Sequence, residues 1–112
     1  MRRILIAAAL LAFAPACSEE ENPDTATILA LTGNADDGQS VYEAKCASCH
    51  KADGTGDASL NYPSLVEHVP HEEEAEMVTL ILDGEEAMPA FRSQLSDQEV
   101  ADVLAYILRE WG

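Results

Sequence analysis

Residues 46–50 read Cys46-Ala47-Ser48-Cys49-His50, two cysteines three positions apart with a histidine directly after the second. On one helical turn this spacing brings the two thiols close together. Two neighbouring thiols can form thioether bonds with the vinyl groups of a haem, and the imidazole of the next residue then lies under the iron. The C-x-x-C-H pattern therefore predicts one covalently attached haem, haem c, bound through Cys46, Cys49 and His50.

Three other interpretations of the cysteine pair stay open. A thioredoxin-like redox pair is expected at the start of a helix that follows a strand, whereas these cysteines close a predicted helix. A zinc site would add His68 and His71, but the gap between these two histidines is shorter than usual, and His50 would have no role. A disulfide between Cys46 and Cys49 would close a very short, strained loop and stabilise little.

The segments around the motif predict an all-α domain. Gly38, Tyr42, Cys46 and Cys49 recur at helical spacing, so they lie on one face of a helix that carries the cysteines. Lys51 to Pro70 is rich in Gly, Pro, Asp and Asn, which indicates a long ordered loop rather than a regular element.

Two further helices are predicted downstream. Glu72 to Leu82 opens with acids and ends before Gly84, which favours a helix with a left-handed glycine after it. Ser96 to Glu99 forms a capping box at the start of the last helix. The apolar residues that follow share one face of that helix: Val100, Val103, Leu104, Ile107, Leu108 and Trp111.

The first and last helices are predicted to pack on each other. Gly38 has no side chain and permits a close approach of the last helix, and Tyr42 should face Tyr106 or Ile107 there. The folded unit, residues 36–112, is of a size at which an apolar core alone is marginal. We therefore expect a bound cofactor to contribute to its stability.

The first residues are predicted to serve export. Met1 to Ala16 combines two arginines, a short apolar run and small residues, the pattern of a signal peptide too short to span a bilayer. Cys17 follows directly, as in bacterial lipoproteins. This favours a lipid-anchored protein on the periplasmic side, attached through Cys17, over a soluble exported protein. Residues 17–35 are acidic at first and predict a tether. The apolar patch Ile28–Leu31 is assigned to this tether, and docking of the patch on the domain stays open as the alternative. The folded domain is then predicted over residues 36–112.

The formal net charge is −15, with 21 Asp and Glu against six Lys and Arg. Such a charge disfavours binding to nucleic acids and to anionic membrane surfaces, because both are negatively charged. A macromolecular partner is instead expected to present a basic surface. The length of 112 residues, part of it a signal, also excludes a large or multidomain enzyme.

The chain resembles class I cytochrome c, the family of small mono-haem electron carriers. Gly38 to Tyr42 with the motif at residues 46–50 is similar to the family's first helix, Ala87 to Phe91 to its distal ligand loop, and Val103 to Trp111 to its last helix. The resemblance covers nearly the whole folded unit. It implies a small cytochrome c fold, with the N- and C-terminal helices crossing around one haem, and one-electron transfer rather than substrate turnover.

The resemblance also implies the two iron ligands, His50 on the proximal side and Met88 on the distal side. Independently of the resemblance, Pro89 disfavours a helical conformation at residue 88, so Met88 lies on a loop. Met77 is the rival methionine, but it lies in an apolar run where methionine is more often a core residue. Met88 is therefore the predicted distal ligand.

A ligating imidazole usually donates its second N–H to a carbonyl or carboxylate group. In the family a loop proline supplies this carbonyl, so the resemblance implies Pro63 as the acceptor for His50, with Leu65 packing on the haem. A role of Pro63 as a turn residue only stays open. His68 and His71 remain alternatives to the distal methionine.

The expected partners are redox proteins, one electron donor and one acceptor. The family often carries a basic ring around the haem edge, whereas residues 36–112 hold 17 Asp and Glu against four Lys and Arg, so the partner surface is expected to be basic. Two other functions stay open. The chain could be the electron-accepting subunit of a larger oxidoreductase complex, or a haem sensor or enzyme, which needs an open iron position that Met88 argues against.

Overall fold

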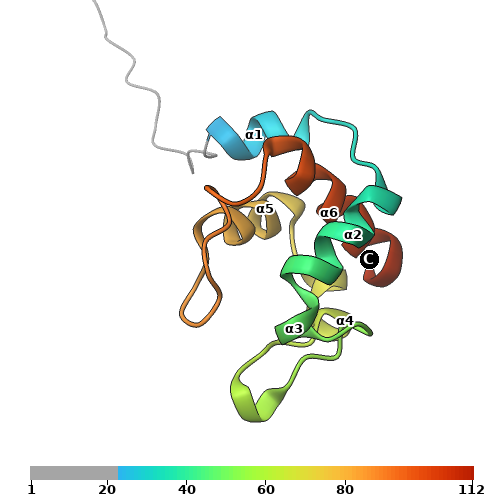
Figure 1. Ribbon diagram of the computed structural model, residues 1–112, viewed down its shortest axis with the longest axis vertical. Helices are drawn as coiled ribbons and strands as arrows, with labels where there is room; N and C mark the ends of the chain where they lie inside the picture. Colours follow the sequence, from blue (N-terminus) through green and yellow to red (C-terminus); the bar gives the residue numbers. More distant parts are fainter. Residues whose placement is uncertain (1–22) are drawn as a thin grey trace, which may run out of the picture.

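The computed structural model describes residues 23–112, which form helices joined by loops (Figure 1). Within this range the α-helices are α1 (Pro23–Leu29), α2 (Ala35–Lys45), α3 (Ala47–His50), α4 (Leu65–His68), α5 (Glu74–Asp83) and α6 (Asp97–Trp111). Two short 3-10 helices are η1 (Ala58–Leu60) and η2 (Val69–His71). The predicted all-α fold class is confirmed.

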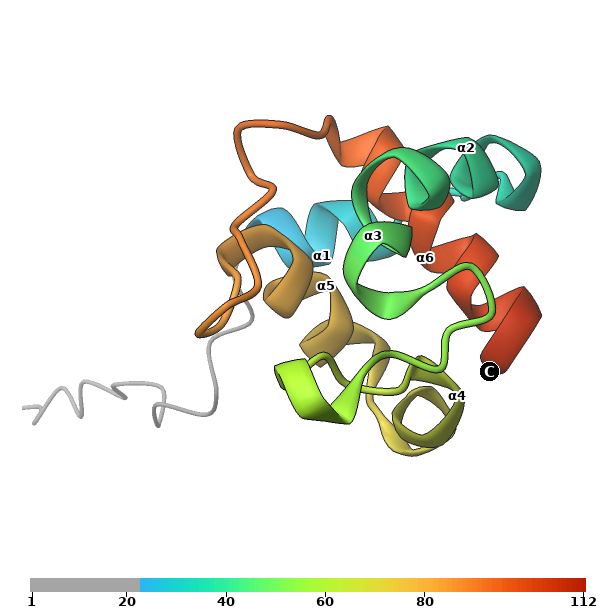
Figure 2. The ribbon, with the colours of Figure 1, turned by 60° about the horizontal axis from the view of Figure 1, so that its bottom comes forward.

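The packing of α2 on α6 is the largest helix contact of the fold (Figures 1 and 2). Gly38 lies against the backbone of α6, where an added Cβ would come within 1.9 Å of the Asp102 carbonyl oxygen. The fully buried Tyr42 ring packs against Tyr106 and Trp111, with centroid separations of 5.3 and 5.2 Å. Both predictions for this interface are confirmed, since Gly38 permits the close approach and Tyr42 faces Tyr106.

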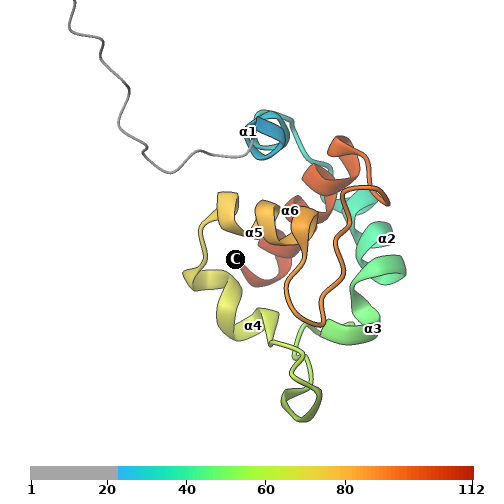
Figure 3. The same cartoon turned by 90° about the vertical axis from the view of Figure 1, so that its left-hand side faces the viewer.

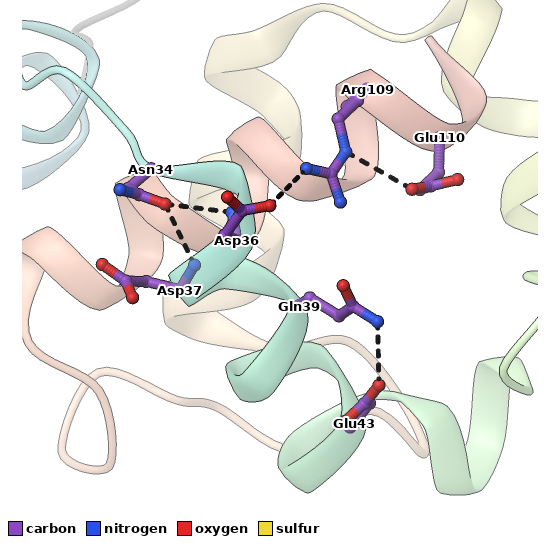
Figure 4. A network of polar contacts seen from close by, with 7 residues as sticks. All are labelled: Asn34, Asp36, Asp37, Gln39, Glu43, Arg109 and Glu110. Atoms are coloured by element: carbon purple, nitrogen blue, oxygen red, sulfur yellow. Dashed lines mark hydrogen bonds and ion pairs between the residues drawn. The ribbon is translucent and has the colours of Figure 1, made fainter.

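Polar contacts fasten the start of α2 to α6, as Figure 4 shows in part. The Asn34 side chain caps α2, because its Oδ1 accepts hydrogen bonds from the N–H groups of Asp36 and Asp37 at 3.0 and 3.1 Å. The Asn34 N–H in turn donates to the buried Asp102 carboxylate at 2.8 Å. Arg109 pairs with Asp36 at 2.9 Å. The two helices are thus fixed in register as well as in contact.

The helices predicted downstream are present, with small differences at their ends. The capping box of α6 is confirmed: Ser96 Oγ accepts from the Glu99 N–H, and the Glu99 carboxylate accepts from the Ser96 N–H, both at 3.1 Å. α5 begins two residues later than predicted, because Glu73 has an extended backbone. Gly84 has the predicted positive φ, 69°, but its ψ of 178° sends the chain away from α5 in an extended path.

The single helix predicted through the cysteines is two helices in the structure. α2 ends at Lys45 and α3 begins at Ala47, because Cys46 between them has φ −117° and ψ −37°, which breaks the regular helix. Residues 51–70, predicted to lack a regular element, contain the one-turn helix α4, capped by the Ser64 side chain. Elements of one turn are too short to produce an apolar period, so the sequence does not indicate them.

The folded unit begins earlier than the predicted boundary at residue 36. Residues 23–29, inside the predicted tether of residues 17–35, form α1, which packs on α5 and α6. Thr25 and Ile28 are each only 1% exposed, and full burial of an isoleucine stabilises by about 1.5–3 kcal/mol. A helix of fewer than two turns gives too little apolar spacing to be distinguished from a linker in the sequence.

Two further predictions concern membranes. Among residues 23–112, every helix is too short or too polar to cross a bilayer. The signal peptide predicted over residues 1–16 and the lipid site predicted at Cys17 lie outside the described residues. The structure therefore bears on the folded domain and its first helix only.

Candidate haem site

Cys46 and Cys49 lie at the two sides of the single turn of α3, and both are half-buried free thiols. Burial, followed by the charge of the neighbouring Cys49, raises the pKa of the Cys46 thiol to about 11. A redox-active pair instead has a thiol pKa below the ordinary value. The raised pKa of Cys46 is opposite in direction to that of a thioredoxin-like pair, and the two cysteines are not joined by a disulfide.

The His50 imidazole is oriented by the carbonyl group of Pro63. The two groups are in direct contact, with 3.0 Å between His50 Nδ1 and the Pro63 carbonyl oxygen, as predicted. A carbonyl oxygen only accepts hydrogen bonds, so Nδ1 must carry the proton and donate it. Nε2 is then the ring nitrogen whose lone pair can bind a metal.

Two glycines, Gly54 and Gly56, allow the loop after α3 to run close to His50 and to Pro63. The Gly56 N–H donates to the His50 carbonyl at 2.9 Å. A Cβ on Gly56 would lie 2.5 Å from the Pro63 carbonyl oxygen, and the residue has a φ of +66°. The Gly54 carbonyl accepts from the Leu65 N–H at 2.7 Å, which fixes the chain just after Pro63. These turn residues thus position the Pro63 carbonyl beside the His50 imidazole.

Tyr62 is a neighbour of Cys49 that the sequence does not single out. Two backbone hydrogen bonds of 2.9 Å between Asp57 and Tyr62 close the intervening loop. The electrostatic interaction with Cys49, and then a side-chain hydrogen bond to Cys49, raise the pKa of Tyr62. No motif or spacing in the sequence relates these two residues, because the loop closure that joins them depends on the backbone alone.

Met88 lies on a tight loop after α5. Glu85 and Met88 exchange two backbone hydrogen bonds of 3.1 and 2.7 Å, so Glu86 and Ala87 form the turn, with Glu86 at a φ of +47°. A Cβ on Gly84 would lie 2.5 Å from the Met88 carbonyl oxygen, so a glycine permits this closure. The Met88 side chain is half-buried and packs against the core. The predicted placement of Met88 on a loop is confirmed.

The predicted site residues lie away from α1. α3 and the segment of residues 51–64 lie at the end opposite to α1, and the loop that carries Met88 runs beside α5 toward the level of α3 (Figures 1 and 3). Leu65, the first residue of α4, is half-buried and packs against the core, as does the rival methionine Met77 on α5. The residues predicted to hold the haem thus come from two stretches of the sequence, residues 46–65 and the loop after α5.

The residues of the alternative zinc site do not come together in the described part of the chain. Within the described part of the chain, no group of three or more His, Cys, Asp and Glu side chains could hold a metal ion. His68 on α4 and His71 on η2 are both exposed. The residues present fit a covalent haem instead: two free thiols on one turn, and directly after them an imidazole with one nitrogen occupied by a carbonyl.

Comparisons with known proteins agree with this chemistry. The family described as cytochrome c oxidase, cbb3-type, subunit III matches residues 33–107. The cytochrome c subunit of alcohol dehydrogenase (quinone) from Gluconobacter oxydans is 31% identical over 83% of this chain and 22% of its own length. The fructose dehydrogenase cytochrome subunit of Gluconobacter japonicus is 35% identical over 68% and 19%. The chain therefore spans about a fifth of the length of these two subunits.

Shorter relatives match over most of their length. Cytochrome c6 of Thermosynechococcus vestitus is 32% identical over 73% of this chain and 75% of its own length. The crystal structure of cytochrome c6 from the diatom Phaeodactylum tricornutum aligns with a TM-score of 0.56 and 32% identity, covering 69% of this chain and 93% of that one. With the helical fold and the C-x-x-C-H turn, these matches show that the chain belongs to the class I, mono-haem c-type cytochromes, a family of electron carriers with one covalently attached haem c.

Proposed function

We propose that this protein carries single electrons between redox proteins, with His50 and Met88 as the axial ligands of its haem iron. The observation that carries the proposal is the 3.0 Å contact between His50 Nδ1 and the Pro63 carbonyl oxygen, directly after two free thiols. When bound, the haem supplies a centre that takes up and releases one electron at a time.

The residues of the chain hold and orient this centre. Cys46 and Cys49 attach it through two thioether bonds, which anchors it in a domain too small to enclose it fully. The Pro63 carbonyl keeps the proton on His50 Nδ1, which directs Nε2 to the iron and raises its basicity. Leu65 supplies apolar surface beside the ring. His50 and Met88, held by the folded chain, would limit the rearrangement that accompanies the gain or loss of one electron.

Replacing Met88 with alanine is expected to remove the weak absorption band of sulfur ligation at the red edge of the visible spectrum. The reduction potential should fall by on the order of 0.1 V, within the roughly 0.8 V over which axial ligands tune haem potentials. The reduced variant should also bind carbon monoxide, which the wild-type protein should exclude. Visible spectra and a potentiometric titration measure these changes.

The matched control is Met77→Leu, which keeps the volume of the other half-buried methionine and should keep the band. A band that survives in Met88→Ala and disappears in Met77→Leu would reverse the assignment of the ligand. Carbon monoxide binding by the wild-type protein would instead favour the haem sensor or enzyme.

We further propose that the electron-transfer partner presents a basic surface. Glu85 and Glu86 are exposed on the loop that carries Met88. Arg92 and Arg109, half of the four Lys and Arg in residues 36–112, are each paired with acids of the same chain, so they offer little free positive charge. Glu85 and Glu86 therefore place two exposed acids beside Met88, which favours encounter with a positively charged partner.

The rate of electron transfer to the physiological partner is expected to fall about tenfold or more from low to high salt, because counter-ions screen steering between opposite charges. Stopped-flow kinetics at a series of salt concentrations measures it. A double variant, Glu85→Gln with Glu86→Gln, should flatten the dependence. Asp37→Asn, at the start of α2, removes an acid far from the Met88 loop and should not (Figures 1 and 2). A rate independent of salt would refute electrostatic steering.

A second candidate function is that of an electron-accepting subunit in a larger oxidoreductase. The matches to cytochrome subunits of alcohol and fructose dehydrogenases favour it. In that case the native protein should co-purify in fixed stoichiometry with a dehydrogenase, whereas a free shuttle should purify alone.

Export and lipid attachment complete the proposal. Residues 1–16 have the pattern of a signal peptide, and Cys17 stands directly after the small residues that precede a lipoprotein cleavage site. We infer attachment of the mature protein to a membrane on the periplasmic side through Cys17. The intact mass of the native protein tests this, since a mature mass without acyl chains contradicts the anchor.

A further inference from the structure

We propose that α1 is a clasp that holds the Met88 loop in its ligating position, so that a helix ahead of the matched family region controls access to the iron. The clasp consists of Asp24 and Thr25 on α1, their partners Arg92 and Thr79, and Asp83, which also binds Arg92. The inference rests on the proposed role of Met88 as the distal ligand.

Arg92 joins the two ends of the Met88 loop. Its Nη2 donates to the carboxylate of Asp83, the last residue of α5, at 2.7 Å. The backbone returns to the same helix end, because the N–H groups of Phe91 and Arg92 donate to the carbonyls of Ile81 and Leu82 at 2.9 and 3.2 Å. The two ends of the Met88 loop therefore lie side by side at the end of α5, and the Arg92 guanidinium links them.

The other arm of the same guanidinium reaches α1. Arg92 Nη1 pairs with the Asp24 carboxylate. The next residue, Thr25, is 1% exposed and shares a hydrogen bond of 3.1 Å with Thr79 on α5. Ile28, also 1% exposed, completes the docking by joining the core. α1 is thus bound both to α5 and to the residue that closes the loop.

α1 lies outside the residues that the family model matches, because the helix ends at Leu29 and that match begins at residue 33. The loop has a reason to open, since Glu86 is held at a positive φ of 47° that side-chain-bearing residues rarely adopt. The contacts of Arg92 with Asp83 and Asp24 hold the two ends of the loop together, so they oppose an opening of the loop in which these ends separate.

The experiment measures how often the loop opens in the oxidised, haem-loaded protein. Added imidazole can reach the iron only after Met88 leaves, so its binding rate reports loop opening. Asp24→Asn removes the α1 arm of an exposed ion pair and should raise this rate about two- to fivefold. Arg92→Gln removes both arms and should raise it further, to about tenfold. The helical signal in circular dichroism should keep a nearly unchanged denaturant midpoint in Asp24→Asn.

Arg109→Gln is the matched control. Arg109 has a similar exposure, 42% against 41% for Arg92, and two acidic partners, but it lies at the α2–α6 contact (Figure 4). It should leave the imidazole rate unchanged. Equal rates in wild type, Asp24→Asn and Arg92→Gln, with the sulfur band present in all three, would overturn the clasp alone. A wild-type protein without the sulfur band would overturn the Met88 assignment and the clasp with it.

Discussion

Gly38→Ala is expected to lower the free energy of unfolding by about 3 kcal/mol or more, a large part of the roughly 5–15 kcal/mol that stabilises a domain of this size. Within a helix, glycine to alanine normally stabilises by about 1 kcal/mol, so the expected sign is reversed. The reason is the contact of α2 with α6, where the new methyl carbon would lie 1.9 Å from the Asp102 carbonyl oxygen and 2.4 Å from its carbon. Backbone atoms cannot rotate away as a side chain does.

Chemical denaturation of the haem-loaded protein, followed by circular dichroism, measures this change. Ser40→Ala is the control, because Ser40 lies on the exposed side of the same helix and its replacement should change the stability by only about 0.5 kcal/mol. A Gly38→Ala protein as stable as wild type would mean that α2 and α6 lie farther apart in solution than in the structure.

The second large effect is expected from the double variant Cys46→Ser with Cys49→Ser. Acidified organic solvent should extract all of its haem, whereas the wild-type protein should retain all of it, because thioether bonds survive this treatment. The variant should also lose much of its helical signal after extraction, since a domain this small has a marginal apolar core. Absorbance of the extracted and retained fractions, with circular dichroism, gives both results.

The single variants test whether one thioether bond is enough to retain the haem. Cys49→Ser keeps one thioether and should keep its haem through extraction, as should Cys46→Ser. Retention of haem by the double variant would refute covalent attachment at this motif, and would leave His50 as a ligand of a haem bound in another way.

Long elements with end signals could be predicted from the sequence. α6 has the Ser96 and Glu99 capping box and several turns of apolar spacing. The sequence pattern therefore predicts both the start of this helix and its buried face. The contact of His50 with the Pro63 carbonyl could be expected only from the family resemblance. The turn residues indicate a loop, but they do not say where its carbonyl groups point.

Contacts between distant short segments could not be predicted. α1 has seven residues, and its burial depends on a surface that α5 and α6 create only after folding. The pairing of Arg92 with Asp24 joins positions 68 residues apart, and both residue types are common on surfaces. The break at Cys46 has no local signal, because its neighbours favour helix on both sides.

The closing contact of the fold also sets an order of assembly. Asn34 at the start of α2 binds Asp102 on α6, 68 positions later, so α2 waits for its partner until the last helix has been made. Bringing such distant segments together costs loop-closure entropy, which the packing of α2 on α6 must offset. A chain that ends before α6 therefore leaves the C-x-x-C-H turn beside a helix that has no packing partner.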